Sequence, residues 1–125
     1  MDPFLECDIR GVYGREITEA FATDLGLAVG TIAGRGPVLV AGDYRTHTPS
    51  LMAALCDGLQ RTGADVVSCG QVPTPVYYFA RHELGIGPAV MVTASHNPPE
   101  YAGFKPILGR LPITPAQIGD LRDRM

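Results

Sequence analysis

The sequence of 125 residues lacks tryptophan and several features that mark special classes of protein. Its ten basic residues form no cluster, although a nucleic-acid surface needs clustered cations to release counterions from phosphates. No apolar run approaches the roughly 18–20 residues that a membrane-spanning helix requires. We therefore expect neither nucleic acid nor a membrane among the partners. With five tyrosines and four phenylalanines as its only aromatic residues, the core must be mostly aliphatic.

Cysteine is also scarce, and the start of the chain is not basic. The three cysteines are Cys7, Cys56 and Cys69; they form no close pair, and an odd number argues against a disulfide framework. An acidic residue stands at position 2, where a secretory signal would have a basic segment. These features predict free thiols in a reducing, cytoplasmic compartment.

Short apolar runs alternate with stretches of helical periodicity. Val38–Ala41, Ala64–Ser68 and Ala89–Val92 are expected to be strands, and the first and third are continuously apolar, which is typical of strands covered on both faces. The stretches with helical spacing are Phe21–Ile32, Leu51–Leu59 and Val76–Leu84. This order predicts one layered α/β domain over residues 1–125, with a mainly parallel mixed β-sheet flanked by helices.

The helix boundaries carry a repeated Thr-Pro signature. Thr48, Thr74 and Thr114 each precede a proline. We expect each threonine to be a helix N-cap, where its hydroxyl accepts a backbone N–H. The proline that follows suits the first helical position, because it has no N–H to leave unpaired. Gly63 and Gly85 follow two of the helical stretches, where a left-handed C-cap is expected. In the first helix, Gly26 and Gly30 lie one turn apart and would permit close backbone packing.

Polar residues follow each predicted strand, at the edge of the sheet where α/β proteins place their chemistry. These clusters are Gly42–Arg45, Gly70–Thr74 and Thr93–Pro99, with a fourth at Asp8–Gly11 near the N-terminus. We expect the four to converge. In the third cluster, Ser95, His96 and Asn97 supply a hydroxyl, a titratable ring and an amide. On residue types alone, the simpler interpretation is a turn whose side chains satisfy nearby backbone groups.

The longer pattern TASHNPPEYAGFK, at residues 93–105, changes that interpretation. It resembles the phosphoserine loop of the α-D-phosphohexomutases, the phosphoglucomutase/phosphomannomutase family. The similarity extends in the family's order to Asp8–Gly11, Gly42–Arg45 and Val72–Pro75, and covers the chain from about Asp8 to its end. TASHNP is long and chemically unusual, so it carries the resemblance, whereas the other three motifs are weak individually.

The resemblance implies a phosphoryl carrier with the fold of the family's N-terminal domain. Ser95 matches the serine that is phosphorylated in the resting enzyme and that binds Mg²⁺ through its phosphate. In the family, this serine gives its phosphate to a hexose monophosphate, and the resulting hexose 1,6-bisphosphate, also the activator, returns its other phosphate to the serine. The net reaction interconverts hexose 1-phosphates and 6-phosphates.

The resemblance also assigns roles to residues around Ser95. Arg10 and Lys105 match cations that contact the transferring phosphate and the substrate and assist proton transfer; charge stabilisation is the firmer role, because arginine is a poor base. His96 and Asn97 match residues that hold the loop or meet the sugar phosphate. From the residues alone, Arg10 and Lys105 could be surface cations at loop ends, and Asn97 could make a loop-end hydrogen bond.

Two further features qualify the resemblance. Asp43 and Arg45 are expected to pair and stabilise the turn after their strand, while the family pattern implies that they form a scaffold under the active site. Cys7 stands where an aromatic residue is common, and Ala102 replaces the usual asparagine. The second departure is expected to remove an amide from the loop that presents Lys105.

The family has four domains, and the resemblance covers one. The sequence contains no aspartate-rich D-G-D-G-D-R metal loop, and its last helix, which begins at Thr114, reaches Met125 without a glycine cap. We therefore expect the N-terminal catalytic-serine domain of a phosphomannomutase/phosphoglucomutase, inactive by itself, whose missing domains hold most of the Mg²⁺ site. The alternatives are a phosphoglucosamine mutase domain, against which the spelling of Glu100–Lys105 argues, and a non-catalytic α/β module that binds a phosphosugar or a protein.

Overall fold

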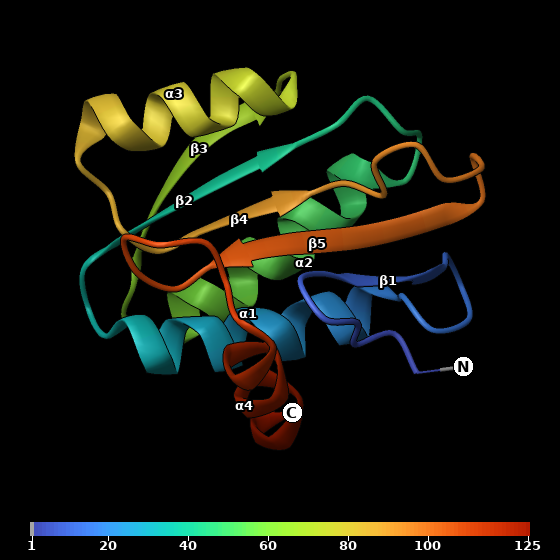
Figure 1. Ribbon diagram of the computed structural model, residues 1–125, viewed down its shortest axis with the longest axis horizontal. Helices are drawn as coiled ribbons and strands as arrows, with labels where there is room; N and C mark the ends of the chain where they lie inside the picture. Colours follow the sequence, from blue (N-terminus) through green and yellow to red (C-terminus); the bar gives the residue numbers. More distant parts are fainter. Residues whose placement is uncertain (1) are drawn as a thin grey trace.

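The computed structural model describes residues 2–125, which form one mixed sheet with helices on both of its faces (Figure 1). The strands are β1 (Ile9–Val12), β2 (Pro37–Gly42), β3 (Asp65–Gln71), β4 (Ala89–Val92) and β5 (Tyr101–Ile107). The helices are α1 (Glu19–Ala33), α2 (Thr48–Arg61), α3 (Thr74–Leu84) and α4 (Pro115–Arg124). Among residues 2–125, no helix is both long and apolar enough to cross a membrane. The α/β class is confirmed, as are the three predicted strands and four predicted helices.

The five strands lie in the order β1-β5-β4-β2-β3. β2 pairs in parallel with β3 and β4, whereas β5 pairs antiparallel with both β4 and β1. Four strands therefore run in one direction and β5 opposes them, which confirms the mainly parallel mixed sheet. Strands β1 and β5 were not predicted from the sequence. In β5, Gly103 and Pro106 are residue types that weaken a strand signal, and Pro106 lies beyond the stretch that pairs with β1.

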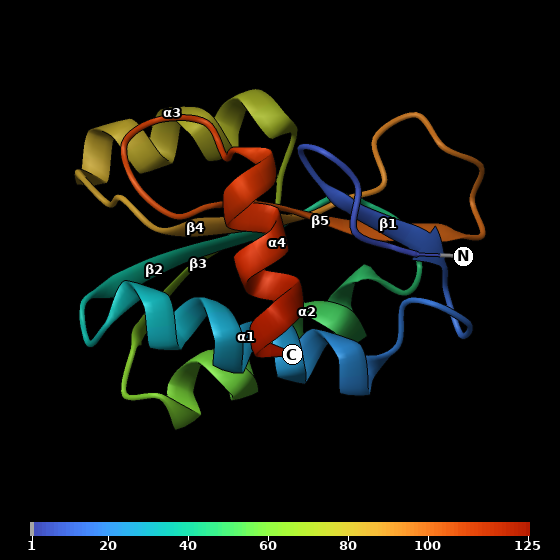
Figure 2. The ribbon, with the colours of Figure 1, turned by 60° about the horizontal axis from the view of Figure 1, so that its bottom comes forward.

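The sheet lies between α3 on one side and α1 and α2 on the other (Figure 2), and it separates two apolar clusters. On one face, helices α1 and α2 cover side chains such as Val40 and Phe104, and α4 joins the same layer. On the other face, the buried Tyr77 of α3 packs against Leu39 and Met91. Alternate residues of β2 and β4 therefore enter different layers, which is why both strands are apolar throughout.

Glycine brings α1 and α2 into close contact. A Cβ atom at Gly26 would overlap the carbonyl oxygen of Leu55, and one at Gly58 would overlap the carbonyl oxygen of Thr23. A Cβ at Gly30 would likewise overlap the side chain of the residue that caps α2. The close packing predicted for this helix is confirmed, and it draws both helices tightly onto the same face of the sheet.

One of the three predicted threonine caps is confirmed and two are wrong. Thr114 caps α4 in a complete capping box. Helices α2 and α3 instead begin at Thr48 and Thr74 themselves, and neither has a side-chain cap. The predicted left-handed C-cap is confirmed at Gly85, where φ is 64°. Helix α2 is capped by Thr62 instead, and Gly63, with φ 88°, is the residue after that cap.

Candidate functional site

The loops that follow β2, β3 and β4 meet at one edge of the sheet and are joined by hydrogen bonds. The Asp43 N–H donates to the carbonyl of Val92 at 2.9 Å, and the Gln71 side chain donates to the carbonyl of Asp43 at 2.9 Å. The predicted convergence is confirmed for these three loops. The fourth cluster lies beside the same edge, because Ile9 of β1 and Val92 at the end of β4 are both opposite Phe104 of β5.

Ser95 lies in the loop that leaves β4 and is exposed. Its φ is 57°, and among residues 2–125 it is the only non-glycine residue with a positive φ. This left-handed conformation costs an L-residue roughly 1–2 kcal/mol, so other contacts must hold it. The N–H of Ser95 donates to Oγ1 of Thr93 at 3.0 Å, while within residues 2–125 the Ser95 hydroxyl has no hydrogen-bond partner. The geometry leaves that hydroxyl free to react.

The two residues after Ser95 differ in their surroundings. The side-chain amide of Asn97 donates to the carbonyl of Ala94 at 2.7 Å, and the Asn97 N–H donates to the same oxygen at 3.1 Å. His96 is exposed, and within the described part of the chain its ring makes no hydrogen bond or ion pair. Asn97 therefore shapes the turn, whereas the imidazole of His96 is open to an incoming ligand.

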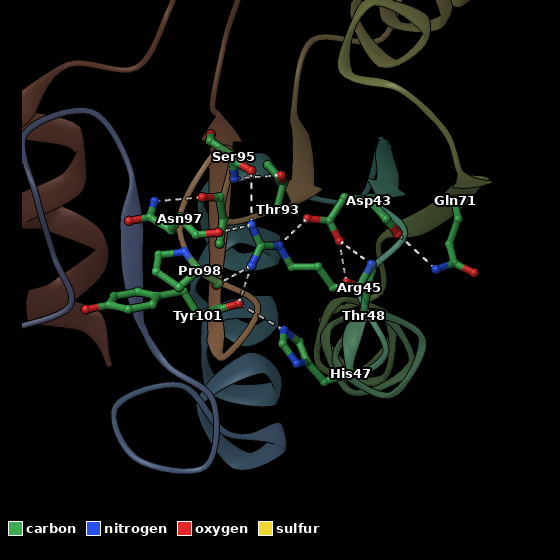
Figure 3. A network of polar contacts seen from close by, with 11 residues as sticks. Asp43, Arg45, His47, Thr48, Gln71, Thr93, Ser95, Asn97, Pro98 and Tyr101 are labelled. Carbon is green, nitrogen blue, oxygen red and sulfur yellow. Dashed lines mark hydrogen bonds and ion pairs between the residues drawn. The ribbon is translucent and has the colours of Figure 1, made fainter.

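Arg45 extends from the loop after β2 into the Ser95 loop (Figure 3). Its side chain is 16% exposed, and its Nε donates to Asp43 at 3.2 Å, which confirms the expected pair. The terminal guanidinium nitrogens donate to four main-chain carbonyls, at Ser95 (3.0 Å), Asn97 (2.6 Å), Pro98 (2.6 Å) and Tyr101 (3.2 Å). One side chain therefore links the two loops.

Asp43 holds Arg45 in place and recruits a second partner. Its Oδ1 accepts from the N–H of Arg45 at 3.1 Å and from the hydroxyl of Thr48 at 2.5 Å. Thr48 is itself the first residue of α2, so this second bond ties the start of that helix to the loop after β2. Nε2 of His47 lies 3.1 Å from the carbonyl oxygen of Tyr101 and supports the same loop. Thr48 and His47 were not predicted to support the site, because neither belongs to a motif that points to it.

Arg10 and Lys105 lie in strands, so the expectation that they occupy loop ends is wrong. Arg10 of β1 is opposite Gly103, and Lys105 of β5 is opposite Met91. Opposed residues share a face of the sheet, and so do alternate residues of one strand, which places both side chains on the α3 face. Nε of Arg10 is 3.1 Å from the carboxylate of Asp8, but that buried N–H makes no hydrogen bond within residues 2–125.

Arg10 and Lys105 line a cavity of about 900 Å³ on this face. The cationic side chains that line it are Arg10, Arg81, Lys105 and Arg110, and the carboxylates are Glu6 and Asp8. The excess of positive charge suits an anionic ligand. Ser95 is not among the lining residues. The predicted site residues therefore form two groups, the cations in the cavity and the Ser95 loop at the edge of the sheet.

Gly103 lies between these two groups. Its carbonyl accepts the N–H of Thr93 at 2.8 Å, and its other neighbour across the sheet is Arg10. A Cβ at this position would overlap the carbonyl oxygen of Ile9 and would lie 2.9 Å from the carbonyl oxygen of Thr93. Glycine therefore allows β1 and the end of β4 to approach β5 closely, which keeps Arg10 near the Ser95 loop.

The structure corrects one expected effect of the departures from the family pattern. Ala102 is 2% exposed and belongs to the apolar layer under α1 and α2. It lies in β5, three residues from Lys105, so the two side chains point to opposite faces. An alanine at this position therefore removes no amide from the side of the strand that presents Lys105. Cys7 is exposed and lines the cavity.

Residues 2–125 do not build a metal site by themselves. Within this range, no three histidine, cysteine or carboxylate side chains come together in a group that would hold a metal ion. Mg²⁺ prefers near-octahedral coordination by oxygen. A phosphate on the exposed Ser95 hydroxyl would provide oxygen at one position, so the rest of the coordination sphere would have to come from elsewhere.

Comparisons with known proteins identify the family. The family described as phosphoglucomutase/phosphomannomutase, alpha/beta/alpha domain I, matches residues 2–125. The phosphoglucosamine mutase of Thermotoga sp. (strain RQ2) is 40% identical over 118 residues, which cover 94% of this chain and 27% of that protein. The phosphomannomutase/phosphoglucomutase of Pseudomonas aeruginosa (strain PAO1) is 40% identical over 125 residues, covering 98% of this chain and 27% of that protein.

A solved structure gives the same result for the fold. The crystal structure of a phosphoglucomutase/phosphomannomutase family protein from Burkholderia thailandensis matches with a TM-score of 0.91 and 41% identity, over 98% of this chain and 29% of that chain. The present chain thus spans between a quarter and a third of the length of these relatives. It belongs to the phosphoglucomutase/phosphomannomutase family, and it corresponds to the family's alpha/beta/alpha domain I.

Proposed function

We propose that this chain is the N-terminal domain of a phosphomannomutase/phosphoglucomutase and that Ser95 carries the phosphate during the reaction. The observation that carries the proposal is the exposed Ser95 hydroxyl, without a partner among residues 2–125, on a left-handed residue at the carboxyl edge of the sheet. A cavity lined with cations lies nearby and suits a sugar phosphate. Three free cysteines accord with the reducing cytoplasm as the compartment in which the enzyme works.

The proposed reaction moves one phosphoryl group at a time. The P–Oγ bond of phosphorylated Ser95 breaks while a hydroxyl oxygen of the hexose monophosphate forms a new P–O bond, and the proton of that hydroxyl passes to a base. The resulting hexose 1,6-bisphosphate then reverses its orientation in the site, so that its other phosphate faces Ser95. Oγ of Ser95 then attacks the phosphorus of the other phosphate. The new P–Oγ bond forms while the bond from that phosphorus to the sugar oxygen breaks, and the sugar oxygen takes back the proton that the base accepted in the first transfer. The serine ends in its initial state, and the sugar phosphate has changed position.

Positioning and charge stabilisation account for most catalysis of phosphoryl transfer. Arg10 and Lys105 supply positive charge on one face of the sheet, where both side chains line the cavity. We assign both residues to phosphate binding and to stabilisation of the transferring group. His96 would meet the sugar phosphate from the exposed side of the loop, and Asn97 would keep the loop in shape for the same contact.

A bound Mg²⁺ would neutralise part of the phosphate charge. In this chain, the phosphate on Ser95 is the group that would hold it. The remaining ligands are assigned to domains outside this chain, which spans 27% of the relatives from Thermotoga and Pseudomonas. The isolated chain is therefore expected to show no mutase turnover, because the other parts of the active site are not present in it.

The test uses the native gene product, purified and treated with phosphatase. Incubation with a hexose 1,6-bisphosphate and Mg²⁺ should add one phosphate, which peptide mapping should place on Ser95. The Ser95→Ala variant should take up none. Stable phosphate on Thr93 or another residue, with turnover retained in Ser95→Ala, would refute the assignment. Turnover by the 125-residue chain alone, abolished by Ser95→Ala, would overturn the division of the site among domains.

One observation favours a second substrate class. The phosphoglucosamine mutase of Thermotoga neapolitana is 48% identical over 98 residues, a higher identity than that to the Pseudomonas enzyme. Relative kcat/KM values for the 1-phosphates of glucosamine, mannose and glucose would decide between the two. The native reading frame separates both enzymes from a non-catalytic module: continuation into an aspartate-rich D-G-D-G-D-R segment favours the enzyme, whereas a stop after Met125 favours the module.

A further inference from the structure

Every side-chain donor of Arg45 is used. A guanidinium has five N–H donors in a fixed, planar arrangement. In Arg45, one of them binds the carboxylate of Asp43, and four bind main-chain carbonyls of the Ser95 loop, between Ser95 and Tyr101 (Figure 3). A side chain that served only to neutralise Asp43 would need one or two of these bonds. The four bonds to carbonyls indicate that Arg45 also supports the backbone of the Ser95 loop.

The Ser95 loop has little internal support beyond its first residues. Its own hydrogen bonds join Ser95 to Thr93 and Asn97 to Ala94, and a single further bond, from the N–H of Tyr101 to the carbonyl of Pro98 at 3.0 Å, closes its second half. The two residues that follow are prolines, which have no N–H to donate. The second half of the loop is therefore held largely from outside, by Arg45, which binds the carbonyls of Pro98 and Tyr101, and by the N–H of Tyr13, which donates to the carbonyl of Glu100 at 2.8 Å.

The contact with Ser95 is the one that bears on chemistry. Thr93 holds the N–H on one side of this residue, and Arg45 holds the carbonyl on the other at 3.0 Å. With both flanking peptide groups fixed, the backbone of Ser95 stays in the left-handed conformation at φ 57°. The direction of its Cα–Cβ bond, and thus the position from which Oγ leaves the loop, follows from that backbone.

We infer that Arg45 is a positioning residue for phosphoryl transfer: it holds Ser95 in the left-handed conformation that presents Oγ. The part that concerns transfer rests on the proposed function, whereas the part that concerns conformation does not. Lysine could not replace it, because one ammonium group cannot reach four carbonyls arranged around a plane. Asp43 contributes by fixing the guanidinium from behind, since the two side chains are only 16% and 19% exposed.

The conformational part is tested by NMR on the 125-residue chain. The three-bond coupling between Hα of Ser95 and the carbonyl carbon of Ala94 is largest when these atoms are trans, which φ near 57° makes them. This coupling should be large in the wild type and fall in Arg45→Lys, and amides of the Ser95 loop should exchange about tenfold faster or more, with core amides unchanged. Arg61→Lys is the matched control, because the Arg61–Asp57 pair is exposed on α2.

The outcomes separate the two parts of the inference. A folded Arg45→Lys variant that retains the large coupling and slow exchange would overturn the positioning function. If that variant does not fold, the wild type decides: guanidinium protons of Arg45 should exchange far more slowly than those of Arg61, and equal exchange would overturn the inference.

The transfer part is tested in the native gene product. Arg45→Lys should slow phosphate uptake from hexose 1,6-bisphosphate about 10–100-fold with KM changed less than about twofold, because a small displacement of the nucleophile affects transfer more than binding. Unchanged uptake by this variant would overturn the transfer part. If wild-type Ser95 takes up no phosphate, the proposed function fails, and with it the transfer part, while the NMR result still decides the conformational part.

Discussion

Replacing Gly103 with alanine tests whether the close approach of three strands organises the site. The added Cβ would overlap the carbonyl oxygen of Ile9 and would lie 2.9 Å from the carbonyl oxygen of Thr93 and 3.0 Å from Cγ of Arg10. Two of these atoms are backbone, so the strands themselves must move. Overpacking of this kind costs about 1–3 kcal/mol. Alanine also lowers the conformational entropy of the unfolded chain, which offsets about 0.4–1 kcal/mol of that cost.

The net loss of about 1–2 kcal/mol in the free energy of unfolding is measurable. At about 4 °C per kcal/mol, the Tm of the 125-residue chain should fall by about 4–8 °C in circular dichroism melts. Gly36→Ala is the matched control, because a Cβ there has no neighbour within 4 Å and the backbone needs no positive φ. A Gly103→Ala protein that melts like Gly36→Ala would contradict the close-approach argument. In the native gene product, Gly103→Ala should also slow turnover, because it displaces Arg10.

Three further predictions concern other parts of the fold. Lys105→Met and Arg10→Ala should each raise the barrier to turnover of the native gene product by about 2–4 kcal/mol, while Tm falls by only a few degrees. Wild-type rates in either variant would count against the assignment, and so would a loss of activity that unfolding explains. Thr114→Ala should lower the free energy of unfolding in urea by about 1 kcal/mol and speed amide exchange in α4, because the capping box is lost; an unchanged value would show that the cap contributes nothing. The hydrogen bond from Tyr13 lowers the pKa of Glu19 in the folded protein. The ionised Glu19 carboxylate therefore stabilises the fold above the ordinary glutamate pKa, and this stabilisation is lost as the pH falls through the lower, folded-state pKa. Urea unfolding at pH 7 and pH 3 should therefore show a smaller acid loss in Glu19→Gln than in the wild type, and equal losses would contradict the assigned pKa shift.

The sequence predicted the elements whose environment is uniform. β2 and β4 are buried on both faces, so their continuous apolar runs were sufficient. β5 was missed because its residues meet different neighbours: Lys105 faces a cavity lined by both charged and apolar side chains, Gly103 adjoins backbone, and Pro106 lies past the end of β1. Local patterns do not contain that information, since each neighbour belongs to a distant segment.

The same limit applies to the candidate site. The pair of Asp43 and Arg45 was predictable, because two opposite charges stand two residues apart after a strand. The four carbonyls that Arg45 binds were not, because they belong to a loop 50 or more residues away. The Thr48 cap was wrong because α2 begins at Thr48 itself, where its hydroxyl donates to a carboxylate of the preceding loop.

The most direct test of the central claim is the intact mass of the native protein before and after phosphatase treatment, followed by peptide mapping. A protein that carries the reacting phosphate on Ser95 should lose the mass of one phosphate, and the phosphopeptide should contain residues 93–105 with Ser95 modified. The treated protein should regain that phosphate from hexose 1,6-bisphosphate. A protein whose mass does not change, and which cannot then be phosphorylated by the bisphosphate, would contradict the account, as would phosphate mapped to any other residue.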